Sequence, residues 1–218
     1  MEKMSYEETI KLLKRFNIPF LELSRAKTLS EAMDVAEKIG YPVAMKIDSP
    51  QISHKTDVGG VVLDIKNEEA LKRGYNNMIN TVRKKAPHAK VKGVIIQKMF
   101  SGDNVREVII GSKYDDQFGH LIMFGLGGIF VEVLKDVSFR LIPIKREDAR
   151  EMIREIKGYE VLEGIRGWKP VNFEKLEDCL LKVSRLIEKN PNIKELDINP
   201  LLINHKEAYV ADIRIFVG

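Results

Sequence analysis

The chain has 218 residues, which is enough for one large domain or for two small lobes that share a cleft. An apolar fraction of 44%, a charged fraction of 31% and a net charge of +4 are typical of a soluble globular protein, and the mild positive charge suits anionic small molecules such as nucleotides. The single cysteine, Cys179, excludes an intrachain disulfide and lies in an apolar helical pattern that predicts burial.

No run of residues approaches the roughly 18 apolar residues of a membrane span, and the N-terminal sequence MEKMSYEE lacks an apolar signal segment. The densest basic group, at 83–92, fits a solvated helix end better than a nucleic-acid patch. We therefore expect a cytoplasmic protein without membrane or nucleic-acid partners.

Helices and short strands follow one another along the chain. Ser5 and Glu8 form a capping box before the first helix, Ser30 is expected to cap the second, and Asn67 is expected to cap a long third helix. The expected helices span 5–16, 30–40, 67–86, 146–156 and 173–189, with a short irregular stretch at 159–168. The expected strands span 20–23, 42–48, 61–66, 93–99, 105–111, 119–124, 137–143, 193–203 and 208–217, with a further apolar run at 129–134.

The turn-like sequence SGDN at 101–104 separates two strand-like runs and predicts a hairpin between them. Helices mixed with hairpins favour an α+β fold over strict alternation of strands and helices. The clearest divide lies near 93–111, so we expect one domain over 1–218, with an N-terminal lobe at 1–100 and a C-terminal lobe at 101–218.

The segment 49–60, SPQISHKTDVGG, reads as a loop between two strands. It offers hydroxyl groups, including that of Ser53, the cation of Lys55 and the adjacent Gly59 and Gly60, all of which can approach a phosphate. His54 adds an imidazole, which is a nucleophile near neutral pH. A lone loop histidine is more often a surface residue, so the rest of the chain has to decide between the two interpretations.

Further polar or glycine-rich features lie on or beside the other predicted strands. Each can also be explained without a functional site. Lys46 can be a solvated lysine, the strand at 97–99 an ordinary core strand, and the glycine cluster an ordinary turn. The aspartate and asparagine side chains near the C-terminus can be turn caps. Asp197 and Asn199 share one strand face by the period of two, and Asp212 can join them across the closing hairpin. These features are Lys46, Gln97-Lys98-Met99, Glu107, the cluster 125–128 followed by Glu132, and Asp197, Asn199 and Asp212.

Three segments, VAMKIDSPQISHKTDVGGV at 43–61, FGLGGIFVEVLKD at 124–136 and ELDINPLL at 195–202, give the chain a resemblance to the ATP-grasp fold. Within that fold, the chain resembles the β subunit of ADP-forming acetyl-CoA (acyl-CoA) synthetases, relatives of succinyl-CoA synthetase. The resemblance implies two lobes with ATP or ADP and Mg²⁺ in the cleft between them. The reaction it implies is acyl-CoA + ADP + phosphate ⇌ carboxylate + CoA + ATP.

The same resemblance implies roles for individual residues. His54 matches the phosphohistidine that relays the phosphoryl group, and Asp197 the acidic residue that orients its imidazole. Arg106 stands where a smaller residue is expected. The nucleotide-binding positions are Lys46, Asp57, Gly59, Gly60, Gln97, Lys98, Met99 and Glu107, and the magnesium ligands are Asn199 and Asp212.

No GxGxxG motif opens a strand–helix–strand unit, so the chain has no recognisable CoA-binding segment. The resemblance therefore implies a separately encoded CoA-binding α subunit, in an α2β2 assembly. Two rival interpretations remain. A single-chain ATP-grasp carboxylate ligase would not need His54, and a non-catalytic nucleotide-binding module could dispense with both His54 and the metal ligands.

Overall fold

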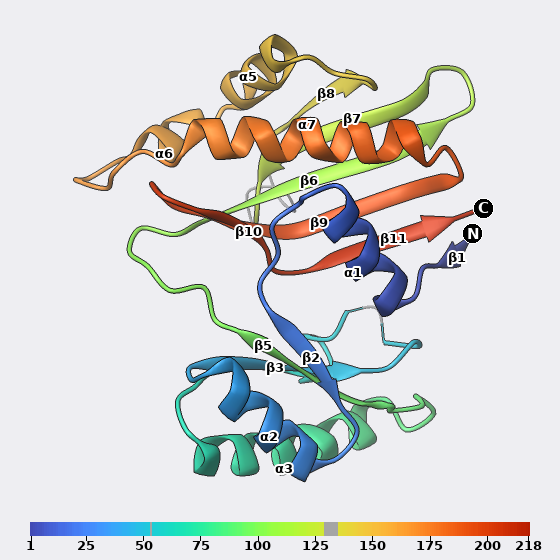
Figure 1. Cartoon of the computed structure of the whole chain (residues 1–218), viewed down its shortest axis with the longest axis vertical. Coiled ribbons are helices and arrows are strands. Elements are labelled where there is room, and N and C mark those ends of the chain that lie inside the picture. Colours follow the sequence, from blue (N-terminus) through green and yellow to red (C-terminus); the bar gives the residue numbers. More distant parts are fainter. Residues whose placement is uncertain (53, 129–134) are drawn as a thin grey trace. The chain divides into compact units, whose positions relative to one another are not determined.

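The computed structural model describes residues 1–52, 54–128 and 135–218. The chain divides into a larger unit, Met1–Phe20 with Gly102–Gly218, and a smaller unit, Leu21–Ser101 (Figure 1). Each unit has its own antiparallel sheet and its own apolar core. The expected α+β class is therefore confirmed. Among the helices that the structure describes, none is long and apolar enough to cross a membrane.

The smaller unit is a four-stranded sheet with two helices packed on one face (Figure 1). Val43, Met45 and Ile47 alternate along the central strand and are fully buried against the helices, as the period of two predicts. The strand order is β2 (Leu23–Ala26), β5 (Gly93–Lys98), β3 (Val43–Asp48) and β4 (Val61–Ile65), and the helices are α2 (Leu29–Ile39) and α3 (Glu68–Lys85).

Of the three helix caps predicted for this unit from the sequence, two are correct. Asn67 accepts a hydrogen bond from the Ala70 amide and begins α3, and Gly40 ends α2 with a φ of +85°. The predicted cap at Ser30 is wrong, because Thr28 accepts from the Glu31 amide instead. Both residues have suitable side chains, but only Thr28 has the extended backbone that a cap requires.

The larger unit is a seven-stranded sheet whose buried side chains pack against helices (Figure 1). Its main path runs β1 (Glu2–Lys3), β11 (Ile213–Val217), β9 (Ile193–Ile203), β6 (Arg106–Asp115), β7 (Gly119–Leu126) and β8 (Val137–Leu141), with β10 (Ala208–Val210) beside β9. The helices are α1 (Tyr6–Arg15), α5 (Arg146–Glu155), α6 (Tyr159–Glu163) and α7 (Phe173–Lys189). The predicted bounds of α7 and β9 are confirmed.

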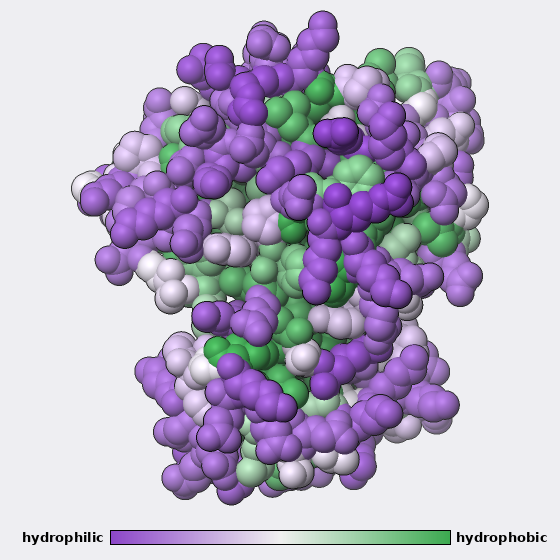
Figure 2. All heavy atoms as spheres, viewed as in Figure 1, coloured by the Kyte–Doolittle hydropathy of each residue, from purple (hydrophilic) through white to green (hydrophobic). Residues whose placement is uncertain are grey.

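One face of this sheet is covered by helices and the alternate side chains project from the other. Val108 and Ile110 of β6, and Ile122 and Phe124 of β7, belong to one core with residues of α1, α5 and α7. In the part of the surface visible in Figure 2, side chains over α5 and α7 are mostly hydrophilic. Cys179 of α7 is buried as predicted, and burial raises the pKa of its thiol to about 11.

The first twenty residues pack with the larger unit rather than with the rest of 1–100. Strand β1 pairs with β11, and Leu13 and Ile18 lie in the larger core. The Val210 amide also donates to the carbonyl of Pro19. The contact division thus differs from the expected lobes at 1–100 and 101–218, because pairing between the two chain ends has no local signature.

The predicted hairpin around 101–104 is wrong. Strand β5 pairs with β2 and β3 in the smaller unit, whereas β6 pairs with β7 and β9 in the larger one. The segment SGDN is therefore one of the two connections between the units, the other lying between Phe20 and Leu21. Polar turn residues and glycine suit a connection as well as a tight turn, so composition could not separate the two.

Two strand predictions also need correction. The strand expected at 20–23 begins at Leu23, and Phe20 instead makes an isolated bridge to Val210. The strand expected at 208–217 is interrupted at Ala211 and Asp212, where both residues bond back to β9. The apolar run at 129–134, with Glu132, and Ser53 lie outside the described residues.

Candidate functional site

In the smaller unit, Lys46 and Gln97 share the sheet face that is not covered by helices. Lys46 is paired with Ile95 in register and Gln97 with Ala44, so both side chains alternate with the buried core residues. Gln97 is only 3% exposed. The alternation therefore places a lysine and a buried amide on one face of the sheet, and their roles at phosphate and base remain predictions.

The two residues after Gln97 use their backbone amides within the smaller unit. Lys98 donates to the carbonyl of Glu22, and Met99 donates to the carbonyl of Pro42 at 3.3 Å. Lys98 ends strand β5 with an exposed side chain. The assignment of Lys98 and Met99 to adenine binding stays a prediction. In this conformation the contact with adenine would have to use groups other than these two amides.

The histidine loop at 49–60 ends in a closed turn. The Gly60 amide donates to the Lys55 carbonyl at 2.7 Å, and the Gly59 amide donates to the Thr56 carbonyl at 3.0 Å. The Gly60 carbonyl then accepts from Ile47 on β3. In this conformation both glycine amides bond within the turn, so the two glycines shape the loop here and their proposed approach to phosphate remains a prediction.

Both ends of the loop are attached to the body of the smaller unit. Ile52 is 4% exposed and belongs to the apolar core. The side chain of Gln51 accepts from the Lys90 amide at 2.6 Å, and Lys85 donates to the Asp57 carbonyl at 3.1 Å. His54 lies between these attachments and is exposed. The geometry thus presents the imidazole from a short segment with fixed ends.

The close packing of Gly60 gives a first prediction, since a Cβ there would lie 2.5 Å from Cγ2 of Ile47 and 2.9 Å from the Lys55 carbonyl oxygen. We expect Gly60→Ala to lower the free energy of unfolding by about 1–3 kcal/mol. Gly74→Ala is the matched control. Gly74 lies inside α3, and a Cβ there would lie 3.5 Å from Cε of Met45, which is an ordinary van der Waals distance. The control should instead raise the free energy of unfolding, by about 0.5–1 kcal/mol. Urea denaturation measures both, and a Gly60→Ala chain as stable as wild type would contradict the tight turn.

In the larger unit, Glu107 and Asp197 project from the helix-free face of the sheet. The side chain of Glu107 is exposed, and its two neighbours along β6 are buried on the other face. Asp197 lies opposite Gly111 of β6 and forms an ion pair with Arg214 at 3.1 Å. Because Asp197 and His54 belong to different units, the predicted orientation of the imidazole by Asp197 stays a prediction.

Asn199 and Asp212 lie side by side where the last strand is interrupted. The Asn199 amide donates to the Asp212 carbonyl at 3.1 Å, and the side chain of Asn199 is exposed. Amide and carboxylate oxygens are ligands that Mg²⁺ accepts. The described residues contain no group of three His, Cys, Asp or Glu side chains that could hold a metal. Magnesium at this pair would therefore need further ligands from phosphates and water, which is how it usually binds with nucleotides.

Gly127 makes a close contact with Glu107 that the sequence did not predict. Its amide donates to the Glu107 carbonyl at 2.7 Å, and a Cβ at this position would lie 3.0 Å from Cβ of Glu107. A side chain at this position would require Glu107 and its backbone to move by a few tenths of an ångström. The glycine cluster thus supports the strand that carries Glu107. Glu132, which follows it, lies outside the described residues.

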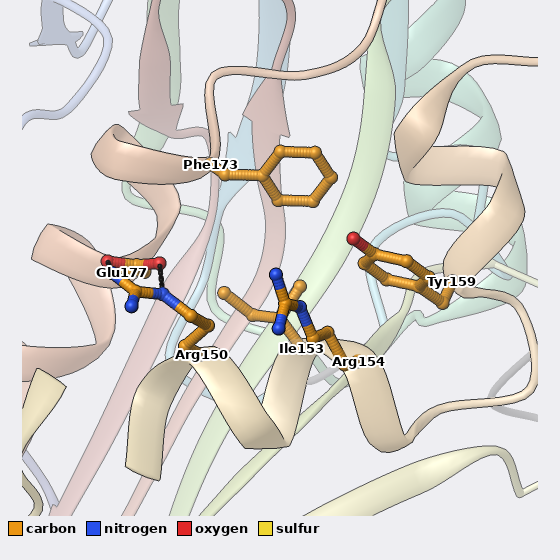
Figure 3. Close-up of a pocket in the computed structure, with 6 residues that line it drawn as sticks. All are labelled: Arg150, Ile153, Arg154, Tyr159, Phe173 and Glu177. Atoms are coloured by element: carbon orange, nitrogen blue, oxygen red, sulfur yellow. Dashed lines mark hydrogen bonds and ion pairs between the residues drawn. The ribbon is translucent and has the colours of Figure 1, made fainter. Parts of the chain in front are cut away.

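A pocket on the helical side of the larger unit does not fit a nucleotide (Figure 3). Its volume is about 160 Å³, below the roughly 300–1,000 Å³ of typical ligand sites. One of its two arginines, Arg150, pairs with Glu177 at 3.0 Å. Tyr159 and Phe173 line it with their rings tilted by 37°. It is a gap between packed helices, and none of the predicted site residues lines it.

The fold and the site define the class of protein. A family model of the ATP-grasp domain matches residues 2–217, which is nearly the whole chain. The Acetate–CoA ligase [ADP-forming] II subunit beta of Pyrococcus furiosus is 51% identical over 96% of this chain and 89% of its own length. The chain therefore belongs to the ATP-grasp family and, within it, to the β subunits of ADP-forming acetate–CoA ligases.

Solved structures agree with this assignment. The dinucleotide forming acetyl-coenzyme A synthetase 1 of Ca. Korarchaeum cryptofilum, in complex with coenzyme A, Ca-AMPCP and HgCl+, is 39% identical with a TM-score of 0.94 and covers 100% of this chain and 94% of that chain. A second structure of that enzyme contains coenzyme A, acetyl-coenzyme A and a phosphorylated phosphohistidine segment. It is 38% identical with a TM-score of 0.88, over 100% and 94% of the two chains. The sequence prediction of fold and family is confirmed.

Proposed function

We propose that this chain is the nucleotide-binding subunit of an enzyme that interconverts acyl-CoA, ADP and phosphate with carboxylate, CoA and ATP. The observation that carries the proposal is the exposed His54 on a short segment with fixed ends, in a chain similar to one described with a phosphorylated phosphohistidine segment. A surface histidine without a role would not need this loop. A ligase that phosphorylates a carboxylate directly would not need the histidine.

The phosphoryl group moves in two substitutions at phosphorus. On the partner, phosphate displaces CoA from acyl-CoA and gives an acyl phosphate. A ring nitrogen of His54 then attacks that phosphorus, so that a P–N bond forms, the bond to the carboxylate oxygen breaks and the carboxylate leaves. A β-phosphate oxygen of ADP attacks next, the P–N bond breaks, and ATP and neutral imidazole result. In-line placement and neutralised oxygens are the main demands of such transfers.

The described residues can meet these demands. Lys46 and Gln97, on one sheet face, suit the phosphates and the base, and Lys98 and Met99 follow directly along the chain. Glu107 suits the ribose or the amino group of the base. When bound at Asn199 and Asp212, Mg²⁺ would neutralise phosphate oxygens, and the adjacency of these two residues supports that assignment.

The remaining positions have assigned but untested roles. Asp57, Gly59 and Gly60 form the turn beside His54 and are proposed to cover the phosphates. Asp197 is proposed to accept from the imidazole, which would fix its tautomer.

The proposed partner is a separately encoded CoA-binding α subunit, since the relative with 51% identity is itself named a β subunit. An α2β2 assembly and a cytoplasmic location are our expectations for the complex. The acyl group is set by the partner's pocket, so acetate is the first substrate to test.

The experiment mixes this chain with candidate α subunits and measures ATP formed from acetyl-CoA, ADP and phosphate. We expect turnover only when both chains are present. Turnover by this chain alone would favour a single-chain ligase. Nucleotide binding without turnover, with any partner that forms a stable complex, would favour a non-catalytic module.

A further inference from the structure

Arg106 opens strand β6 and is only 4% exposed. Its guanidinium donates to three backbone carbonyls: Asn104 at 2.5 Å, Lys169 at 2.8 Å and Val161 at 3.1 Å. It also lies 4.9 Å from the centre of the Trp168 ring. Burial lowers the pKa of Arg106 from its ordinary value, yet a guanidinium stays charged in proteins. Backbone dipoles and an aromatic face thus hold this buried charge.

The three carbonyls belong to a connecting segment, a short helix and a loop. Asn104 lies in the SGDN connection between the two units, and its φ of +58° is a left-handed conformation that asparagine tolerates. Val161 lies in the short helix α6, and Lys169 lies in the loop between α6 and α7, where Gly164, Arg166 and Gly167 all have positive φ. The hydrogen bonds of Arg106 therefore tie the connection and this loop to the first residue of β6.

The next residue along β6 is Glu107, which projects from the opposite face. Its carbonyl accepts from Gly127, and it is paired with Leu202 in register. Successive side chains of a strand point to opposite faces, so an Arg106 fixed in the interior also fixes the direction of Glu107. A shift of the strand end would carry the carboxylate with it.

We propose that Arg106 is a positioning residue for nucleotide binding, because its bonds to three carbonyls hold the start of β6 so that Glu107 meets the nucleotide. This inference rests on the proposed function. Lysine cannot replace the guanidinium, since its ammonium lacks the planar fork of donors that reaches three separate carbonyls. Trp168 also helps to hold the guanidinium of Arg106 in place, because its ring covers one face of it.

The test is a double-mutant cycle on the affinity for Mg–ADP, measured by calorimetry on the full chain. We expect Arg106→Lys to weaken binding roughly tenfold and Glu107→Gln to weaken it by a similar factor. The double variant should bind only about as weakly as either single variant, within roughly twofold, because both changes remove the same interaction. If Arg106 had a purely structural role, the double variant would instead lose affinity by the product of the two single fold-changes.

Two further variants keep the test decisive. Trp168→Leu changes a half-exposed side chain and should weaken binding in the same direction by a smaller factor. Arg140→Lys is the matched control and should leave the affinity unchanged, since Arg140 of strand β8 pairs with Glu151 and Glu155 of α5. Hydrogen exchange should rise around 104–108 and 159–169 in Arg106→Lys only.

Three results would overturn the inference. They are unchanged affinity in Arg106→Lys, unchanged affinity in Glu107→Gln, and losses that multiply in the double variant. Failure of the wild-type chain to bind Mg–ADP would refute the proposed function itself, and it would be seen before any variant is compared.

Discussion

Replacing His54 with asparagine is expected to abolish turnover of the assembled enzyme, by roughly a thousandfold or more. The amide keeps the size and polarity of the side chain but cannot form a P–N bond, so the relay has no carrier. Incubation with γ-labelled ATP, magnesium and the α subunit should label the wild-type protein with an acid-labile, base-stable phosphoryl group. The same incubation should leave His54→Asn unlabelled.

The nucleotide affinity separates loss of chemistry from loss of the fold. His54 is exposed, so His54→Asn should leave the fold intact and should bind Mg–ADP as tightly as wild type. His88→Asn is a matched control, because His88 is also exposed in the smaller unit and lies outside the histidine loop, and it should retain full turnover. A His54→Asn enzyme that completes the reaction at a comparable rate would refute the relay.

Asp212→Ala is expected to weaken Mg–ADP binding by about 10–100-fold, since the variant removes one of two proposed oxygen ligands of the metal. The backbone bond between the Asn199 amide and the Asp212 carbonyl is independent of the side chain, so the strand interruption should persist. Calorimetry at several magnesium concentrations measures the effect. The affinity for ADP without magnesium should change little.

The control for this variant is Asp116→Ala, an exposed carboxylate in the turn between β6 and β7 of the same unit. It removes the same charge from the larger unit without touching the proposed ligands. Equal losses in both variants would mean that net charge, rather than metal ligation, governs the affinity. Unchanged affinity and magnesium dependence in Asp212→Ala would remove it from the site.

Local patterns predicted most of the helices well. The capping box of Ser5 and Glu8 is present, Asn67 begins α3, and the bounds of α7 agree residue for residue. These features depend on side chains three or four residues apart, which the chain brings together as soon as a helix forms. The error at Ser30 arose where two possible caps lie two residues apart, and the backbone of Thr28 decides between them.

Pairing between distant strands was not predictable in the same way. The run at 105–111 was expected to fold back on 93–99, yet it pairs with β7 and with β9, almost a hundred residues further on. The first twenty residues likewise join the far end of the chain through β1 and β11. Each strand has the same apolar alternation whichever neighbour it takes, so the pattern does not name the partner.

The candidate site shows the same division between sequence and tertiary structure. The sequence by itself determined the residue types, the family and the sheet faces of Lys46 and Asp197, because alternation along one strand is a local property. Only the tertiary structure decided that the guanidinium of Arg106 is bound by three backbone carbonyls. These contacts join positions up to 63 residues apart, and they form only when strands and loops that are distant in sequence pack into one core.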